Sequence, residues 1–369
     1  MKKKIALIFG GVSSEHEISR VSAACILEQL PPVYDVVKLG ITKEGRWLYY
    51  PGGSEAMRTG AWAEDPGCTP AFLSPDRSLH GLVRWNGSAF VPEHVDVVFP
   101  VLHGKNGEDG TIQGLLELSG IPYVGCGVLA SAACMDKVVT NTLFANAGVP
   151  HCRWDWMTAA QLPDFDAVEA RVAAKLGYPI FVKPANAGSS VGVSCAHNAT
   201  ELHAAAELAA RHDNKIVFAE AVVGSEVECA VLGNPVHGEA DLLASAPGEI
   251  VAASAFYDYD AKYHSSDSRT LIPARITPQQ QEQVRTLAKK AYTALGCSGL
   301  SRCDFFVRSN GEVLINEINT LPGFTAISMY PQLIQHEGFR YGELLQRLIE
   351  LAEERGAREL ALQQRSVQR

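Results

Sequence analysis

The sequence predicts an α/β protein with several domains, the first of which is built on a doubly wound parallel sheet. The chain has 369 residues, more than one ordinary hydrophobic core accommodates, so we expect two or three domains. The apolar segment KIALIF at residues 4–9 predicts a buried parallel strand, and the apolar stripe after GGVS predicts a helix. Two further apolar segments, at residues 34–39 and 95–100, complete the pattern of a doubly wound domain.

Composition and charge favour small-molecule chemistry. Hydrophobic residues make up 47% of the chain and charged residues 20%, as in soluble globular proteins. The 32 basic and 41 acidic residues give a net charge of -9, so the surface would repel nucleic acid and anionic membranes. The nine cysteines are scattered and form no CxxC pair, as expected for reduced thiols. We therefore expect a cytoplasmic protein with no nucleic-acid or membrane partner.

The middle of the chain predicts an insertion and a second, smaller α+β domain. Residues 51–92 are rich in Gly, Pro, Trp and Ser, which predicts a peripheral insertion with a hairpin around residues 84–90. The second domain should hold helices at residues 166–176 and after the N-cap Asn198, with strands at 178–183 and 216–220.

The last third of the chain predicts a helix followed by a hairpin. Thr277 has the position of an N-cap, Pro278 that of the first helical residue, and Gly296 follows the last turn. The next segment, RCDFFVRSNGEVLINEIN, is typical of two strands that turn at Asn310 and Gly311.

The stretch FVKPANAGSSVG at residues 181–192 joins a lysine at a strand end to a small, flexible loop. Lys183 and the backbone N–H groups around Ser189 and Ser190 have the chemistry to surround a polyphosphate. The glycines follow the lysine instead of preceding it, so this is not a Walker A loop. A surface turn with a solvated lysine is the alternative interpretation.

The predicted hairpin brings oxygen ligands together. Because side chains alternate along a strand, Glu317 and Asn319 share one face, and Arg302 and Asp304 share a face of the partner strand. A turn near residue 310 sets Asp304 nearly opposite Glu317. Such oxygens suit one or two Mg²⁺ ions that carry ATP phosphates, although the solvated face of a hairpin would also explain them.

These segments together resemble the ATP-grasp superfamily. GGVSSEHEIS near the N-terminus, LHGKNGEDG from Leu102, MDK from Met135 and FYDYDAKY from Phe256 are similar, within it, to the D-alanine:D-alanine ligase family. The resemblance implies a three-domain ATP-grasp fold, with domains at residues 1–134, 135–228 and 229–369. It also implies that ATP phosphorylates one D-alanine and that the amine of a second attacks the acyl phosphate, for peptidoglycan precursor synthesis.

The resemblance assigns the nucleotide and metal residues. Lys137 and Lys183 match the lysines that hold the ATP phosphates, with Ser190 beside them, and Glu226 matches the carboxylate that receives the ribose hydroxyls. Glu220, next to Ala219, stands near the residue that contacts the adenine amine in relatives. Two Mg²⁺ or Mn²⁺ ions would be bound by Asp304, Glu317 and Asn319.

The resemblance also assigns the catalytic and substrate residues. Arg302 and the N–H of Gly323 match the groups that stabilise the tetrahedral oxyanion. Glu15 matches the carboxylate that binds the first ammonium, although its position alone suggests a helix-dipole residue. The remaining assignments are a triad partnership of Ser189 and Tyr263 with Glu15, a carboxylate contact from His103, a lid at residues 258–270 that carries Lys262 and Tyr263, and a second-substrate contact from Ser328 beside Met329.

Several alternatives remain open. An apolar Met329 and a lid with Lys262 and Tyr263 favour D-alanine as the second substrate, with D-serine or D-lactate as the alternative. GCGVLA at residues 125–130 fits the glycine pattern of a nicotinamide-dependent dehydrogenase, but lacks the acidic residue about twenty positions on. A noncatalytic ATP-binding regulator is a further alternative. The resemblance implies a homodimer, and the apolar face of the first helix is a candidate contact.

Overall fold

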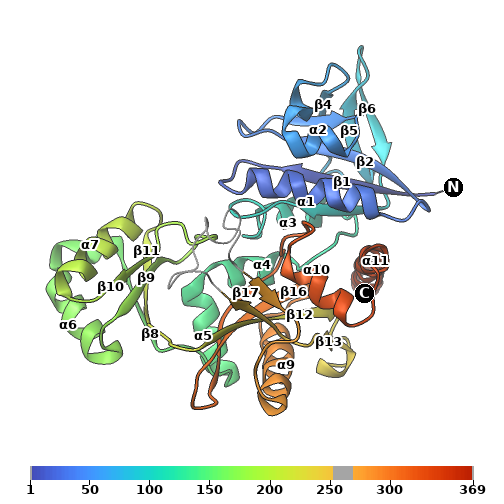
Figure 1. The fold of residues 1–369 in the computed structure, drawn as a ribbon. Coiled ribbons are helices and arrows are strands. Elements are labelled where there is room, and N and C mark those ends of the chain that lie inside the picture. The colour runs from blue at the N-terminus through green and yellow to red at the C-terminus, as the bar shows by residue number, and fades with distance from the viewer. Residues whose placement is uncertain (1, 252–268, 368–369) are drawn as a thin grey trace.

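The computed structural model describes residues 2–251 and 269–367, and its strands form three sheets (Figure 1). The sheets have seven, four and six strands and follow one another along the chain. Helices accompany all three, which confirms the predicted α/β class.

The first sheet combines a parallel part with an antiparallel extension. The three strands expected from the sequence are parallel neighbours in the order β2-β1-β7. Beyond β2 the sheet continues with β3, which precedes the predicted insertion, and then with β4, β5 and β6 from the insertion, all antiparallel. The predicted hairpin joins β5 to β6, with Trp85 paired to Phe90. The short connections from β2 to β3, from β4 to β5 and from β5 to β6 can link only antiparallel strands, whereas the longer connection from β3 to β4 contains α2 (Ser54–Thr59). The strands are β1 (Lys3–Gly10), β2 (Tyr34–Ile41), β3 (Trp47–Tyr50), β4 (Thr69–Leu73), β5 (Gly81–Trp85), β6 (Phe90–His94) and β7 (Val97–Val101).

Strand β1 is buried on both faces. Ile5 and Leu7 pack in a core with α1 (His16–Gln29) and α11 (Tyr341–Val367), while Ala6 and Ile8 pack in a second core with α3 (Thr111–Ser119). The buried side of α1 contacts β1, α2 (Ser54–Thr59) and α11. Of the apolar stripe that the sequence predicted on α1, Cys25 is buried, whereas Ile18 and Val21 are only half-buried, so the dimer contact stays a prediction.

The second sheet is antiparallel, in the order β10-β9-β11-β8. Helices α6 and α7 share one core with its strands. The predicted cap is confirmed, because Asn198 Oδ1 accepts a hydrogen bond of 3.0 Å from the Glu201 N–H. The elements are β8 (Trp154–Thr158), α6 (Phe165–Leu176), β9 (Ile180–Pro184), β10 (Ser194–Ala196), α7 (Ala199–Ala210) and β11 (Lys215–Glu220).

The third sheet has the order β15-β14-β12-β16-β17, with β13 paired to β12. Helices α9 and α5 cover one face with an apolar core. The predicted start of α9 is confirmed, since Thr277 caps it and Pro278 begins it. The expected domain boundary at 228/229 falls inside β12 and stays a prediction. The elements are α5 (Lys137–Ala147), β12 (Ser225–Gly233), β13 (Leu243–Ala244), β14 (Gly248–Val251), β15 (Arg269–Leu271), α9 (Pro278–Ala294), β16 (Gly299–Val307) and β17 (Val313–Asn319).

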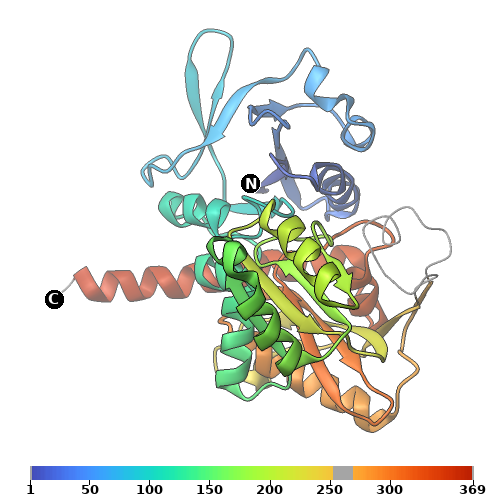
Figure 2. The same cartoon turned by 90° about the vertical axis from the view of Figure 1, so that its left-hand side faces the viewer.

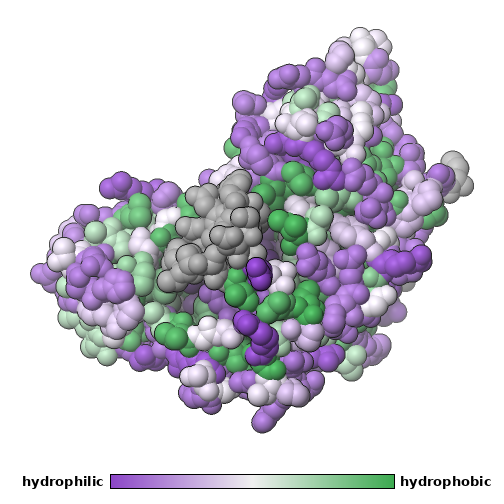
Figure 3. Space-filling view, in the orientation of Figure 1, coloured by the Kyte–Doolittle hydropathy of each residue, from purple (hydrophilic) through white to green (hydrophobic). Residues whose placement is uncertain are grey.

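Two further α-helices of the described chain are α4 (Val128–Met135) and α10 (Met329–His336), and short 3-10 helices lie at Ala61–Glu64, Ala159–Asp164 and Glu239–Asp241. Helix α11 runs away from the body, with the C-terminal end outermost (Figure 2). The face in Figure 3 mixes hydrophilic and hydrophobic residues. In residues 2–251 and 269–367, no helix is long and apolar enough to cross a membrane.

Candidate active site

The face of the third sheet opposite α9 is partly covered by α10 and α11, and it carries a row of three carboxylates. Asp304 on β16 lies opposite Glu317 on β17 and opposite Glu228 on β12, and residues that lie directly opposite in an antiparallel pair point to the same face. The predicted approach of Asp304 to Glu317 is therefore confirmed. We call Glu228, Asp304 and Glu317 the carboxylate row.

A β-bulge in β17 changes which of its residues point to each face of the third sheet. The register shifts between the pairs on either side of Asn316, so Ile315 and Ile318 both reach the core under α9 although they are three residues apart. Glu317 keeps the opposite face, and the extra residue, Asn316, also lines the pocket there. Lys183 Nζ donates to Asn316 Oδ1 at 3.5 Å. Asn316 was missed because strict alternation excludes it.

One guanidinium lies beside the carboxylate row. Arg302 donates from Nε and Nη2 to the two oxygens of Asp304, at 2.7 and 2.6 Å, and its Nε lies 3.0 Å from Glu228 Oε2. Burial lowers the pKa of Arg302, but the charges of Asp304, Glu228 and Glu317 together raise it. Arg302 is thus held as a cation, and three carboxylates share it.

Glu228 is a site residue that the sequence reasoning missed. It is buried on β12 between Val227 and Cys229, both of which belong to the α9 core. The signal was present, because alternation places Glu226 and Glu228 on the same face, opposite those core residues.

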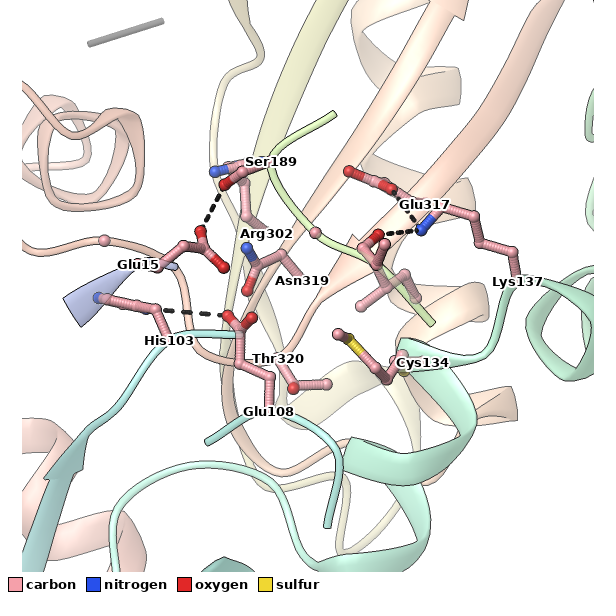
Figure 4. Close-up of a pocket in the computed structure, with 15 residues that line it drawn as sticks. Glu15, His103, Glu108, Cys134, Lys137, Ser189, Arg302, Glu317, Asn319 and Thr320 are labelled. Atoms are coloured by element: carbon pink, nitrogen blue, oxygen red, sulfur yellow. Dashed lines mark hydrogen bonds and ion pairs between the residues drawn. The ribbon is translucent and has the colours of Figure 1, made fainter. Parts of the chain in front are cut away.

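The loop at residues 185–193 reaches the start of α1 (Figure 4). Ser189 Oγ donates to Glu15 Oε1 at 2.5 Å, so the predicted pairing of these two side chains is present. Ser189 and Ser190 have φ angles of 50° and 58°, which non-glycine residues adopt rarely and at a cost. A Cβ at Gly188 would lie 3.2 Å from Glu15 Oε2, so a glycine permits this close approach.

His103 lies near Glu15, next to Glu108 (Figure 4). Its Nδ1 lies 3.1 Å from the Leu321 carbonyl oxygen and 3.8 Å from Glu108 Oε1; because both oxygens accept, Nδ1 carries the proton. Burial lowers the pKa of His103, but the hydrogen bond and charge of Glu108, with further help from Glu15 and Leu321, raise it overall. Glu108, Glu15 and the Leu321 carbonyl therefore favour the positively charged form of the His103 imidazole.

The two predicted phosphate lysines approach the site from different elements. Lys137, the first residue of α5, donates from Nζ to the Ala187 carbonyl at 2.8 Å and lies 4.0 Å from Glu317 Oε2. Burial lowers the pKa of Lys137, against the charge of Glu317, and the positive charge of Lys183 lowers it further.

Most of the predicted site residues line two adjoining pockets that share Ser189 and Glu317, whereas Lys183 is on neither wall and reaches the site through Asn316. The first is lined by residues of all three sheet regions, and the second by residues of the third sheet and the 185–193 loop. Predicted residues on the first pocket are Glu15, His103, Lys137, Ser189, Arg302, Glu317, Asn319 and Gly323. Those on the second are Ser189, Ser190, Glu226, Asp304 and Glu317.

Some predicted residues lie away from these walls. Glu220 accepts from the Arg153 backbone N–H and guanidinium at 2.8 to 3.0 Å and pairs with Arg308 at 2.9 Å. Met329 is buried, and its Sδ packs beside Gly248. Lys262 and Tyr263 lie outside the described residues.

Ser328 lines neither pocket but lies beside Gly323, which lines the first. Its Oγ accepts from the Thr325 N–H at 3.0 Å and would lie 2.8 Å from a Cβ at Gly323. A side chain at position 323 would therefore displace the Ser328 hydroxyl from the Thr325 N–H.

The donor set suits a divalent cation that is shared with a ligand. In the described part of the chain no group of three or more His, Cys, Asp or Glu side chains is arranged to hold a metal ion by itself. Mg²⁺ commonly takes one or two carboxylates and completes its shell with water and phosphate oxygens. The surplus negative charge of the carboxylate row fits such a shared ion.

Comparison with known proteins assigns the family. The family model described as the D-ala D-ala ligase N-terminus matches residues 4–126, and the D-ala D-ala ligase C-terminus matches residues 143–350. The chain belongs to the D-alanine–D-alanine ligase family. It is 48% identical to the D-alanine–D-alanine ligase of Acetivibrio thermocellus and 46% identical to that of Ruminiclostridium cellulolyticum, with 96% of both chains covered in each case.

Solved structures of the family have the same fold. The VanG D-Ala:D-Ser ligase from Enterococcus faecalis superposes with a TM-score of 0.86 at 40% identity, over 95% of this chain and all of the other. The D-alanine–D-alanine ligase from Coxiella burnetii gives a TM-score of 0.86 at 32% identity over the whole of both chains. The resemblance to the family is thus confirmed, and the dehydrogenase interpretation of GCGVLA is dropped.

Proposed function

We propose that this protein joins two D-alanine molecules into D-alanyl-D-alanine, with ATP converted to ADP and phosphate. The observation that carries the proposal is the pair of adjoining pockets that share Ser189 and Glu317. One pocket has the groups for an amino acid, the other those for a nucleotide, and Arg302 lies where the two meet.

The first pocket has complementary charges for D-alanine. Glu15 would receive the ammonium group, with Ser189 holding its carboxylate in place. His103, whose raised pKa favours the imidazolium, would face the substrate carboxylate. Ser328 would contact the carboxylate of the second D-alanine.

The second pocket would hold the ribose of the nucleotide, and the phosphates would extend to the junction with the first pocket, which Lys137 and Asn319 line. Glu226 would accept the ribose hydroxyls, and Lys137, Lys183 and Ser190 would surround the phosphates. Asp304, Glu317 and Asn319 would bind magnesium or manganese, two ions in all, which would neutralise phosphate charge as it develops.

The chain's own residues would stabilise the transition state. The D-alanine carboxylate takes the γ-phosphoryl group of ATP, and the amine of the second D-alanine then attacks the acyl carbon. Arg302 and the N–H of Gly323 would stabilise the resulting oxyanion before phosphate leaves. Lys262 and Tyr263 would close the site against water, and this lid stays a prediction, as do the homodimer and the cytoplasmic location.

The test is D-alanine-dependent phosphate release from ATP with Mg²⁺, with the product identified by mass. We expect D-alanyl-D-alanine as the main product from D-alanine alone and from equal mixtures with D-serine or D-lactate. D-alanyl-D-serine as the main product would instead give the chain the specificity named for the VanG ligase. Phosphate release that does not depend on D-alanine would contradict the proposal.

A further inference from the structure

We propose that Glu228 is a positioning residue that keeps Arg302 at the pocket wall when Asp304 turns from Arg302 to a metal ion. The inference rests on the proposed function, because it needs a metal and a nucleotide in the second pocket. Glu228 would thus join the site residues, and its effect on metal binding would act through Arg302.

The first step is a conflict at Asp304. Both of its carboxylate oxygens accept hydrogen bonds from Arg302, at 2.7 and 2.6 Å. A carboxylate held in this bidentate way has its oxygens directed at the guanidinium. Each oxygen keeps a second lone pair for a metal ion, but a bound cation would compete with the guanidinium for the same negative charge and so weaken at least one of these bonds.

The second step is the consequence for Arg302. The Arg302 side chain is only 7% exposed, and a buried cation that loses its anion is strongly destabilised. Without another anion, Arg302 would oppose the release of Asp304 and so oppose metal binding.

Glu228 is placed to be that anion. Its Oε2 already lies 3.0 Å from Arg302 Nε, the same nitrogen that donates to Asp304. Nε carries one hydrogen, so the two carboxylates compete for it, and Glu228 can take it as Asp304 leaves. Glu228 is the more deeply buried competitor, with 5% of its side chain exposed against 16% for Asp304, so Asp304 is the one that solvent and ligand reach more easily.

A double-mutant cycle tests whether Glu228 acts through Arg302. The four proteins are wild type, Glu228→Gln, Arg302→Met and the double variant, and the measured quantity is the dissociation constant of Mn²⁺ in the presence of ADP, from the paramagnetic resonance signal of free Mn²⁺. No turnover is needed. We expect Glu228→Gln to weaken Mn²⁺ binding by about tenfold or more when Arg302 is present, and by less than about twofold when it is absent.

The same loss in both backgrounds would overturn the inference, because Glu228 would then act on the metal directly or by its charge alone. No loss in either background would also overturn it. Wild-type protein that neither binds Mn²⁺ with ADP nor forms the dipeptide would overturn the proposed function as well.

Two further variants are included, one as a control and one as a replacement if Glu228→Gln does not fold. Glu249 is a buried carboxylate on the neighbouring strand β14 that pairs with Arg275 at 2.8 Å and lines neither pocket, so Glu249→Gln should leave Mn²⁺ binding unchanged. If Glu228→Gln does not fold, Glu228→Asp takes its place in the cycle, since the shorter side chain keeps the charge but withdraws it from Nε. The same coupling to Arg302 is then expected.

Discussion

Two clusters of arginine and carboxylate in this molecule have opposite charge balance. At Glu220, one carboxylate is shared by Arg153 and Arg308. At Arg302, one guanidinium lies beside the carboxylate row of three acidic side chains. The first cluster has two guanidinium groups around Glu220, one of which also pairs with Glu312, whereas the second has three carboxylates beside Arg302, with Lys137 Nζ 4.0 Å from Glu317. This difference distinguishes a cluster that holds the fold together from one that is built for a ligand.

The largest effect is expected at the arginine of the second cluster. Arg302→Met should lower kcat for dipeptide formation by about 10²- to 10³-fold, the usual loss when one oxyanion donor is removed. Arg153→Met, the matched change in the Glu220 cluster, should leave kcat within about twofold of wild type. Steady-state phosphate release measures both, and comparable losses in the two variants would remove the distinction between the clusters.

The next effect concerns the metal requirement. Asp304→Asn keeps the shape of the side chain but removes one charge from the carboxylate row, so the Mg²⁺ concentration that gives half-maximal activity should rise about tenfold or more. Activity measured against Mg²⁺ concentration at saturating ATP tests this. An unchanged curve would show that Asp304 is not a metal ligand.

A smaller effect is expected from Glu220→Gln, and on stability instead of activity. The loss of its charged hydrogen bonds should lower the free energy of unfolding by about 1 to 2 kcal/mol, towards the low end because the Arg153 side chain is 58% exposed. Urea unfolding measures this change. A raised KM for ATP with unchanged stability would instead support the adenine contact that the sequence suggested for Glu220.

The smallest effect is expected in the pH dependence of the stabilisation by Glu220. Burial raises the pKa of Glu220, but the hydrogen bonds from Arg153 and Arg308 lower it overall from the ordinary 4.5. A lowered folded-state pKa means that the stabilisation is complete above the unfolded-state pKa and is lost as the pH falls through the folded-state pKa. The stability difference between wild type and Glu220→Gln should therefore be constant from about pH 6 to pH 8 and shrink below about pH 4.5. A difference that grew on acidification would contradict this sign.

Local patterns predicted much of the fold and part of the site. The cap at Thr277 and the hairpin turn at Gly311 follow from residues only a few positions apart, and the turn set Asp304 opposite Glu317 as expected. Such features depend on backbone hydrogen bonds and side-chain alternation, both of which act over short distances.

What the sequence could not provide depends on contacts between distant segments. Glu220 is held by Arg153, 67 residues earlier, and Met329 is buried beside Gly248, so neither side chain's surroundings could be inferred from its neighbours in sequence. The bulge changes the face of the sheet to which Asn316 points, and no glycine at that position indicates it in the sequence. The charge balance of a cluster likewise appears only once its strands are paired.

The most direct test of the charge-balance account is calorimetry of ADP binding to the wild-type protein with and without Mg²⁺. If the carboxylate row needs a cation, Mg²⁺ should tighten ADP binding by at least about tenfold, and Glu220→Gln should keep this gain. Equal affinity for ADP with and without Mg²⁺ would contradict the account, because the three carboxylates around Arg302 would then be satisfied without a metal.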